Sequence, residues 1–303
     1  MVIQDNLIKL MQERRALIDR TLDGLVSPES QPPGGLHRAM RYTLFAPGKR
    51  IRAILALLAA RHLGGNEQYA LSSACALEMV HAASLILDDL PAMDNASLRR
   101  GLPSNHQKFG EATAILAAIG LLNRAFGVIA EDEVLSDATR TRLSAILSRA
   151  IGSEGLVAGQ EQDLKWPDIT PTRSNVEIVH ARKTGALFSS AAEMAAVAVA
   201  ADEDHIALMR DLGMKLGLAF QILDDLIDAT STPETAGKDV AQDVDSPSLV
   251  RVIGAEAASQ EARRYVREAT ALIDMSAAGA DGLLRHFALT LIAGLENKLK
   301  AAS

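Results

Sequence analysis

The sequence predicts an all-α protein, and three observations carry this prediction. Hydrophobic residues make up 48% of the 303 residues, yet aromatic residues make up only 3%. Ala and Leu supply most of the apolar side chains and both favour helices, whereas β-sandwiches and barrels use more aromatic and β-branched residues. Apolar residues recur at helical spacing almost from end to end, and no pair of strands joined by a hairpin turn is evident.

Five segments rich in Gly, Pro, Ser or Asp interrupt the helical pattern and are expected to be loops. They are residues 27–35, 64–66, 101–110, 166–173 and 231–248. The stretch near the amino terminus is charged and predicts a surface helix. We find no fixed-period repeat and no change in composition between segments, so residues 1–303 are expected to form a single domain.

Charge and cysteine content exclude several classes of protein. The formal net charge of −7 argues against a nucleic-acid groove, which needs a basic face. Cys75 is the only cysteine, so no intrachain disulfide is possible, which suits a reducing cytoplasm. The amino terminus lacks the apolar core of a signal peptide, and apolar runs such as residues 112–122 are about half the ~20 residues of a membrane span. We expect a cytoplasmic protein without a transmembrane segment.

An acidic stripe closes the apolar run at residues 220–228, which read FQILDDLID. At about 100° per residue, Asp224, Asp225 and Asp228 share one helix face with Gln221, and the apolar residues occupy the other. Three carboxylates this close repel one another, so the pattern predicts a bound cation. Oxygen ligands favour Mg²⁺ or Ca²⁺ over Zn²⁺.

A second acidic cluster closes an earlier apolar run, at Asp88 and Asp89. Pro91 interrupts the helix that precedes it, so helix geometry does not place Asp94. Upstream, His81 and Ser84 are expected on the same face as Asp88. One acidic stripe is usually a solvated helix face. Two of them favour a metal–diphosphate site, because Mg²⁺ completes its shell with water and substrate phosphates.

Basic residues recur beside glycines or helix starts, where backbone N–H groups favour phosphate. The four groups are Gly48-Lys49-Arg50-Ile51-Arg52, Arg99-Arg100-Gly101, Lys183-Thr184-Gly185 and Gly237-Lys238-Asp239. Arg contacts phosphate in a bidentate manner and Lys acts as a point charge. A single basic pair in a loop is usually only solubilising, so the prediction of diphosphate binding depends on the four groups together.

In order and spacing, these motifs resemble those of polyprenyl (isoprenyl) diphosphate synthases over nearly the whole chain; Gly159-Gln160 and Asp163-Leu164 complete the pattern. The resemblance implies a single-domain bundle of mostly antiparallel helices around a deep central cavity, assembled as a homodimer. It also implies head-to-tail, trans condensation of isopentenyl diphosphate with dimethylallyl, geranyl or farnesyl diphosphate. The expected cofactor is Mg²⁺, at about two to three ions per site.

The resemblance also implies a role for each matched residue. Magnesium ligands would be Asp88, Asp94 and Asp224, supported by Asp89, Asp225 and Asp228. The allylic diphosphate would contact Arg99, Lys183, Thr184, Gln221 and Lys238, and isopentenyl diphosphate would contact Lys49, Arg52, His81 and Arg100. Catalysis would depend on Asp88, Asp89, Asp94, Arg99, Lys183, Asp224, Asp225 and Lys238. His81 has a second interpretation, as a buried core histidine with no ligand.

Product length is expected to depend on Ala83, the residue five before Asp88, and on its neighbour Ser84. Farnesyl diphosphate synthases that resemble this chain carry an aromatic residue at the position of Ala83, and a methyl group leaves the pocket open. Helix geometry puts Ser84 closer than Ala83 to the face of Asp88. Residues 80–89, 114–118 and 124–130 resemble bacterial carotenoid-pathway geranylgeranyl diphosphate synthases, so we predict a C20 product.

Three alternatives remain open at this point. A farnesyl diphosphate synthase would stop at C15. A terpene cyclase also ionises an allylic diphosphate, but the second diphosphate site at Lys49 and Arg52 argues against it. A non-catalytic regulatory subunit of a synthase is the third, because Ser246 stands where many relatives carry a lysine.

Overall fold

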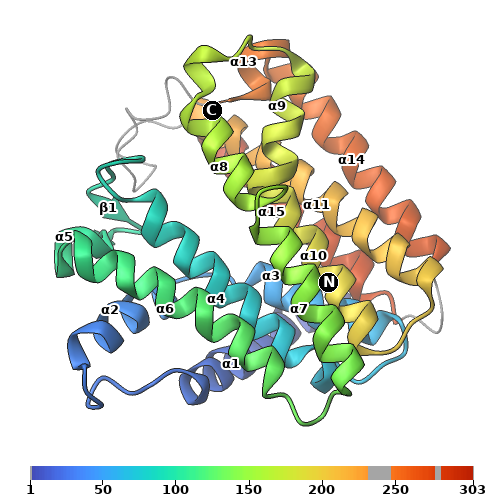
Figure 1. Cartoon of the computed structure of the whole chain (residues 1–303). Helices are drawn as coiled ribbons and strands as arrows, with labels where there is room; N and C mark the ends of the chain where they lie inside the picture. Colours follow the sequence, from blue (N-terminus) through green and yellow to red (C-terminus); the bar gives the residue numbers. More distant parts are fainter. Residues whose placement is uncertain (1, 231–246, 277–280, 303) are drawn as a thin grey trace.

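The computed structural model describes residues 2–230, 247–276 and 281–302, and most of them are helical, which confirms the all-α class (Figure 1). The first half of the chain forms α1 (Val2–Leu25), α2 (Gly34–Leu44), α3 (Ile51–His62), the 3₁₀ turn η1 (Glu67–Ala70), α4 (Leu71–Asp88), α5 (Asn105–Phe109), α6 (Glu111–Ala130) and α7 (Asp137–Ile151). The second half forms α8 (Leu156–Leu164), the 3₁₀ turn η2 (Trp166–Asp168), α9 (Arg173–His180), the π-helical turn η3 (Ala181–Gly185), α10 (Ala186–Ala198), α11 (Glu203–Thr230), α13 (Leu249–Ile253), α14 (Ala255–Met275) and α15 (Leu283–Ala302).

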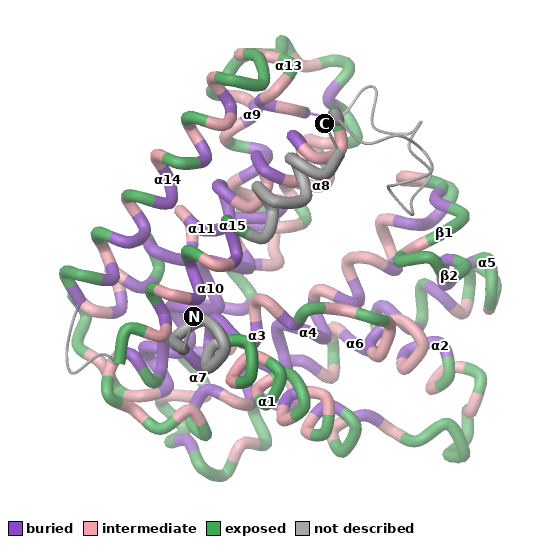
Figure 2. Tube along the Cα trace, turned by 180° about the vertical axis from the view of Figure 1, so that it is seen from behind, coloured by how far each residue is buried: buried purple, intermediate pink, exposed green. Residues whose placement is uncertain are grey.

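Helix α10 lies at the centre of the bundle. Its residues from Leu187 to Ala198 are all buried, and it packs against α3, α7 and α11. Nine of these twelve residues are apolar, which predicts such a position, and Ser189, Ser190 and Glu193 are the polar exceptions. The outer helices carry a buried side and an exposed side, as the alternating colours along them show (Figure 2).

Helices α4 and α6 are each long and apolar enough to cross a membrane by length and composition alone. In the stretch from Glu67 to Asp88, which contains α4, 72% of the most apolar window is buried inside the protein, so packing within the bundle accounts for this helix. In α6 the buried share is 39%. Helix α6 therefore keeps an exposed apolar side.

The loop predictions were only partly correct, and most of the last of them, residues 231–246, lies outside the described residues. Residues 101–110 contain the short helix α5 and one strand of a two-stranded ladder, which pairs β1 (Leu98–Arg99) with β2 (Leu102–Pro103). The turn between the strands is Arg100-Gly101, and both residues have positive φ angles, as a tight hairpin turn requires. This strand pair is not evident in the sequence, because a two-residue strand leaves no alternating pattern to detect. Further breaks lie between the helices at residues 45–50, 131–136 and 199–202.

Candidate active site

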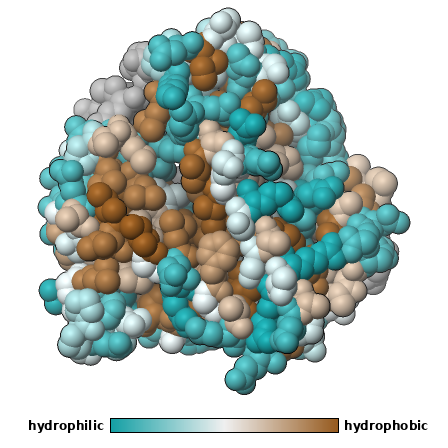
Figure 3. Space-filling model, viewed as in Figure 1, coloured by the Kyte–Doolittle hydropathy of each residue, from teal (hydrophilic) through white to brown (hydrophobic). Residues whose placement is uncertain are grey.

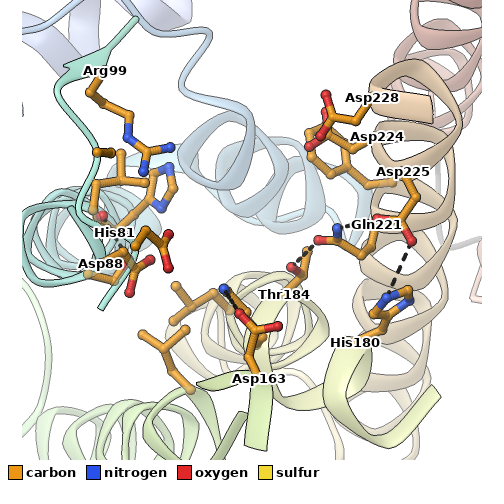
Figure 4. A pocket seen from close by; sticks show the side chains of 18 of the residues that line it. His81, Asp88, Arg99, Asp163, His180, Thr184, Gln221, Asp224, Asp225 and Asp228 are labelled. Carbon is orange, nitrogen blue, oxygen red and sulfur yellow. Dashed lines mark hydrogen bonds and ion pairs between the residues drawn. The ribbon is translucent and has the colours of Figure 1, made fainter. Parts of the chain in front are cut away.

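A deep cavity of about 980 Å³ opens in the bundle. Its wall is formed by the start of α3, the carboxyl-terminal half of α4, the β1–β2 hairpin, α8, the η3 turn with the start of α10, and the end of α11. The predicted acidic and basic motifs that fall on described residues come together at this cavity. Asp88 reaches it from one side, and Asp224, Asp225 and Asp228 from the other (Figure 4). Asp94 also lines the cavity.

The first acidic cluster is shaped by the end of α4 at Asp88. Pro91 follows in a tight turn, and the backbone N–H of Asp94 donates to the carbonyl oxygen of Asp88 at 2.9 Å. This turn brings Asp94 back to Asp88, a position that helix geometry alone did not give. Burial raises the pKa of Asp88 to about 7; Lys183 opposes the shift and Asp94 adds to it.

Asp89 lies behind this pair and is 2% exposed. The Nε atom of Arg99 donates to its Oδ1 atom at 2.8 Å. Burial nevertheless raises the pKa of Asp89 against the effect of Arg99. The sequence pattern predicted a supporting role for Asp89 and a substrate role for Arg99, and the geometry joins the two: Asp89 holds the arginine that borders the cavity.

The second acidic cluster lies on α11 and is held by a chain of hydrogen bonds. Thr184 Oγ1 donates to Gln221 Oε1 at 2.5 Å, and Gln221 Nε2 donates to Asp225 Oδ1 at 2.8 Å. Burial raises the pKa of Asp225 to about 8 despite the bond from Gln221, and Asp224 raises it further. The predicted polar stripe is thus confirmed as one face of α11, turned to the cavity (Figure 4).

His180 supports the second cluster and had not been singled out in the sequence. It is buried, and burial lowers its pKa to about 4, so the ring is neutral. Its Nε2 atom donates to the carbonyl oxygen of Pro247 at 3.1 Å and lies 3.4 Å from Asp225 Oδ2. That oxygen has no hydrogen-bond partner among the described residues and is buried.

The donor set fits a hard divalent cation. All the candidate ligands are carboxylates, and closely spaced carboxylates with raised pKa values need a counter-charge. Within residues 2–230, 247–276 and 281–302, no three Asp, Glu, His or Cys side chains are gathered into a ready-made metal site. A cation held by Asp88, Asp94 or Asp224 would therefore take its remaining ligands from water or phosphate, as Mg²⁺ does.

Lys183 lies on the π-helical turn η3 and lines the cavity. It forms an ion pair with Asp163 of α8. Burial alone would lower the pKa of Lys183, but the negative charges of Asp163 and Asp88 outweigh the effect of burial, and the pKa of Lys183 is raised. Gly159, one turn before Asp163, lets α8 approach the turn: a Cβ there would lie 2.8 Å from the Cα of Lys183. The sequence pointed to Lys183 but gave no role to Asp163 or Gly159.

A third group of cations lies at the start of α3. Burial lowers the pKa of Arg52 to about 10, and its guanidinium carbon is 4.8 Å from the centre of the Phe188 ring. Burial also lowers the pKa of His81, and Arg52 and Arg100 add to this effect, so His81 is neutral. His81 lines the cavity with Arg52, Arg100 and Lys49, which separates it from an ordinary core histidine.

Of the two residues expected to set product length, Ser84 lies on the cavity wall next to Leu85. Ala83 is fully buried in the main hydrophobic core and is not part of this wall. Two further positions, Lys238 and Ser246, lie outside the described residues.

Comparison with known proteins gives one family. A model of the family described as polyprenyl synthetase matches residues 34–278. A geranylgeranyl diphosphate synthase of Pseudescherichia vulneris is 44% identical over 257 residues, 84% of this chain and 82% of the relative. A geranylgeranyl diphosphate synthase of Pantoea ananas is 41% identical, and the match covers 94% of this chain and 93% of that relative. A farnesyl diphosphate synthase of Geobacillus stearothermophilus is 39% identical, and the match covers 86% of this chain and 91% of that relative.

Solved structures give the same fold. An FPP/GFPP synthase from Zymomonas mobilis superposes with a TM-score of 0.85 at 30% identity, covering 96% of this chain and all of that one. A geranyltransferase from Helicobacter pylori, complexed with magnesium and isoprenyl diphosphate, superposes with a TM-score of 0.84 at 29% identity, covering 96% and 98%.

Proposed function

The chain belongs to the polyprenyl synthetase family and is a prenyltransferase, and from this premise we propose that it condenses isopentenyl diphosphate with allylic diphosphates head-to-tail in trans to give geranylgeranyl diphosphate. One observation carries the proposal: two acidic clusters face each other across one cavity (Figure 4), and its wall also holds two sets of cations, Arg99 with Lys183 and Lys49 with Arg52 and Arg100. Two diphosphates need separate groups of cations, and a metal that bridges to phosphate needs acidic residues opposite one another.

The allylic diphosphate is assigned to the acidic half of the cavity. Asp88, Asp94 and Asp224 would hold Mg²⁺, which when bound would neutralise charge on the leaving diphosphate. Arg99 and Lys183 border the same space and stabilise that charge as the allylic C–O bond breaks. Asp89, Asp225, Asp228, Thr184, Gln221 and Lys238 complete the proposed allylic and metal-binding set.

Isopentenyl diphosphate is assigned to Lys49, Arg52, His81 and Arg100. Its double bond attacks the allylic carbon, a C–C bond forms, and a proton is lost from the isopentenyl unit. The step needs no protein nucleophile. Cys75 is buried away from the cavity, and burial raises the pKa of its thiol to about 12, which agrees with a purely structural role.

The C20 product is supported by the small side chain of Ser84 on the wall of the cavity and by the two geranylgeranyl diphosphate synthases at 44% and 41% identity. A C15 product is the second candidate, because a farnesyl diphosphate synthase matches at 39% identity. The two products differ by one isoprene unit, so the depth available beyond Ser84 decides between them.

We further propose a homodimer of single-domain subunits in the cytoplasm. The exposed apolar side of α6 supports the dimer: Ile115, Leu116 and Ile119 are 40%, 57% and 55% exposed. An apolar area extends over this helix on the molecular surface (Figure 3). Three large apolar side chains on one exposed helix face favour burial against a partner.

The test is a turnover assay. The purified protein is incubated with Mg²⁺, labelled isopentenyl diphosphate and each allylic starter, and the dephosphorylated products are resolved by chain length. A dominant C20 product that vanishes with a chelator is expected. A product that stops at C15 would support the second candidate. Absence of product from every starter, with turnover restored by a partner subunit, would replace the proposal with a regulatory role.

A further inference from the structure

A buried acid lies among the cations assigned to isopentenyl diphosphate. Glu78 of α4 is 4% exposed and precedes His81 by one helical turn. It borders the cavity together with Arg52 and Arg100. A carboxylate that touched a diphosphate would repel it, so direct contact with substrate does not explain this residue.

The contacts of Glu78 are with the frame of the site. Its Oε2 atom accepts from Arg50 Nη1 at 3.2 Å, and its Oε1 atom accepts from the backbone N–H of Ala53 at 3.4 Å. Ala53 is in the first turn of α3, where N–H groups lack helical partners, and the residue before the helix provides no side-chain cap. Glu78 therefore supplies the negative charge that the start of α3 favours.

Arg50 connects Glu78 to the backbone that carries Lys49 and Arg52. It precedes α3 with φ of 52°, a left-handed conformation that a non-glycine residue adopts under strain. Besides Glu78, its guanidinium donates to Asp19 Oδ1 at 2.8 Å and to the Leu44 carbonyl oxygen at 2.6 Å. These contacts fix the backbone between Lys49 and Arg52, and so the directions in which these two side chains leave it.

Electrostatics give Glu78 a second effect. Arg100 lies close enough to Arg52 for its positive charge to lower the pKa of Arg52. The Nε atom of Arg52 is buried and has no hydrogen-bond partner in the described part of the chain. The negative charge of Glu78 raises the pKa of both arginines and so favours their charged forms. The cations can therefore stay together before a diphosphate binds.

We infer that Glu78 is a positioning residue: through Arg50 and the first turn of α3, it holds in place the cations that bind isopentenyl diphosphate. The inference rests on the proposed function for the identity of that substrate. It predicts different effects on the two substrates, because the hydrogen bonds of Glu78 are with Arg50 and Ala53 at the start of α3 and, among the described residues, with none of the groups assigned to the allylic diphosphate.

The test compares Glu78→Gln with Glu193→Gln. Glu193 is a matched control, since it is also buried and paired with an arginine, Arg149, but lies on α10 outside the cavity wall. Glu78→Gln should raise the KM for isopentenyl diphosphate about tenfold or more, the loss expected when a charged hydrogen-bond partner is removed. The KM for the allylic substrate should stay within about twofold, and Glu193→Gln should change neither. Glu78→Asp keeps the charge and should recover part of the loss.

Equal increases in both KM values, or unchanged KM values with only a lower melting temperature, would overturn the inference. Should Glu78→Gln fail to fold, Arg50→Lys must give the same selective increase, and an unchanged KM for isopentenyl diphosphate in that variant would also overturn it. Calorimetric binding of isopentenyl diphosphate alone is measured in parallel. If the wild-type chain shows no turnover, the proposed function fails, while weaker binding to Glu78→Gln than to Glu193→Gln still supports the positioning role and equal binding refutes it.

Discussion

Replacement of Gly159 by alanine tests whether the close approach of α8 to the π-helical turn places Lys183. The new Cβ would lie 2.8 Å from the Cα of Lys183 and 2.9 Å from the carbonyl carbon of Arg182. Ordinary contact begins at 3.4 Å, so the Cα of Lys183 must move by about 0.6 Å, and its backbone nitrogen, which lies closer still, by more. All three are backbone atoms, so a change of rotamer does not relieve the contact.

The expected effects result from this displacement. Misplacement of a substrate-positioning group by about 1 Å can cost about 10²-fold in rate, so we expect kcat/KM for the allylic substrate to fall between about tenfold and a hundredfold. Overpacking costs about 1–3 kcal/mol, which for a chain of this size lowers the melting temperature by about 2–6 °C. Steady-state kinetics with each substrate varied and thermal unfolding measure the two effects.

Gly24→Ala is the matched control. Gly24 lies in α1 and is exposed, and no described atom outside its own helical backbone lies within 4 Å of the place that an added Cβ would take. This variant should therefore keep its activity and gain slightly in stability. A Gly159→Ala enzyme with wild-type kinetics and melting temperature would refute the argument that backbone contact at this position holds Lys183.

Three further predictions concern the wall, the metal and the surface. Ser84→Phe should shift the main product from C20 towards C15, because Ser84 lies on the cavity wall. Ala83→Phe should instead overpack the core and lower the melting temperature by several degrees. A stable Ala83→Phe enzyme with a shortened product would contradict the placement of Ala83 in the core. The Mg²⁺ concentration that gives half the maximal rate should rise up to about tenfold for each pH unit below about 7. The reason is that Asp88, whose pKa is raised to about 7, must lose a proton before it binds a cation. A half-maximal Mg²⁺ concentration that does not change between about pH 6 and pH 8 would contradict this prediction. Leu116→Glu should give monomers in sedimentation velocity, while Met275→Glu, at an exposed apolar site on α14, should not.

Helical periodicity was enough to predict the fold class and the acidic face of α11. Asp224, Asp225 and Asp228 share that face because an unbroken helix fixes their relative directions. The placement of Asp94 could not be predicted, since it depends on a backbone hydrogen bond in the turn after Pro91. The β1–β2 hairpin was missed because its turn is Arg100-Gly101, which differs from the usual Asn-Gly signal.

Roles that depend on contacts between distant segments were also out of reach of the sequence. Glu78 and Arg50 are 28 residues apart, and Asp163 and Lys183 are 20 apart, so neither ion pair leaves a local pattern. Buried acids are nonetheless unusual. An acid in an otherwise apolar helix, such as Glu78 three residues before His81, is a signal that can be searched for.

The π-helical turn at Ala181–Gly185 bears on which changes in chain length the protein tolerates. A π turn holds about one residue more than an α turn, and each residue of a helix rotates the next one by about 100° about the axis. Deleting one residue here would restore α geometry, yet it would turn either Lys183 away from Asp163 or Thr184 away from Gln221. A one-residue deletion inside this regular-looking helix should therefore be far more damaging than the same deletion in the exposed turn after α6, although a sequence alignment would treat both as a single gap.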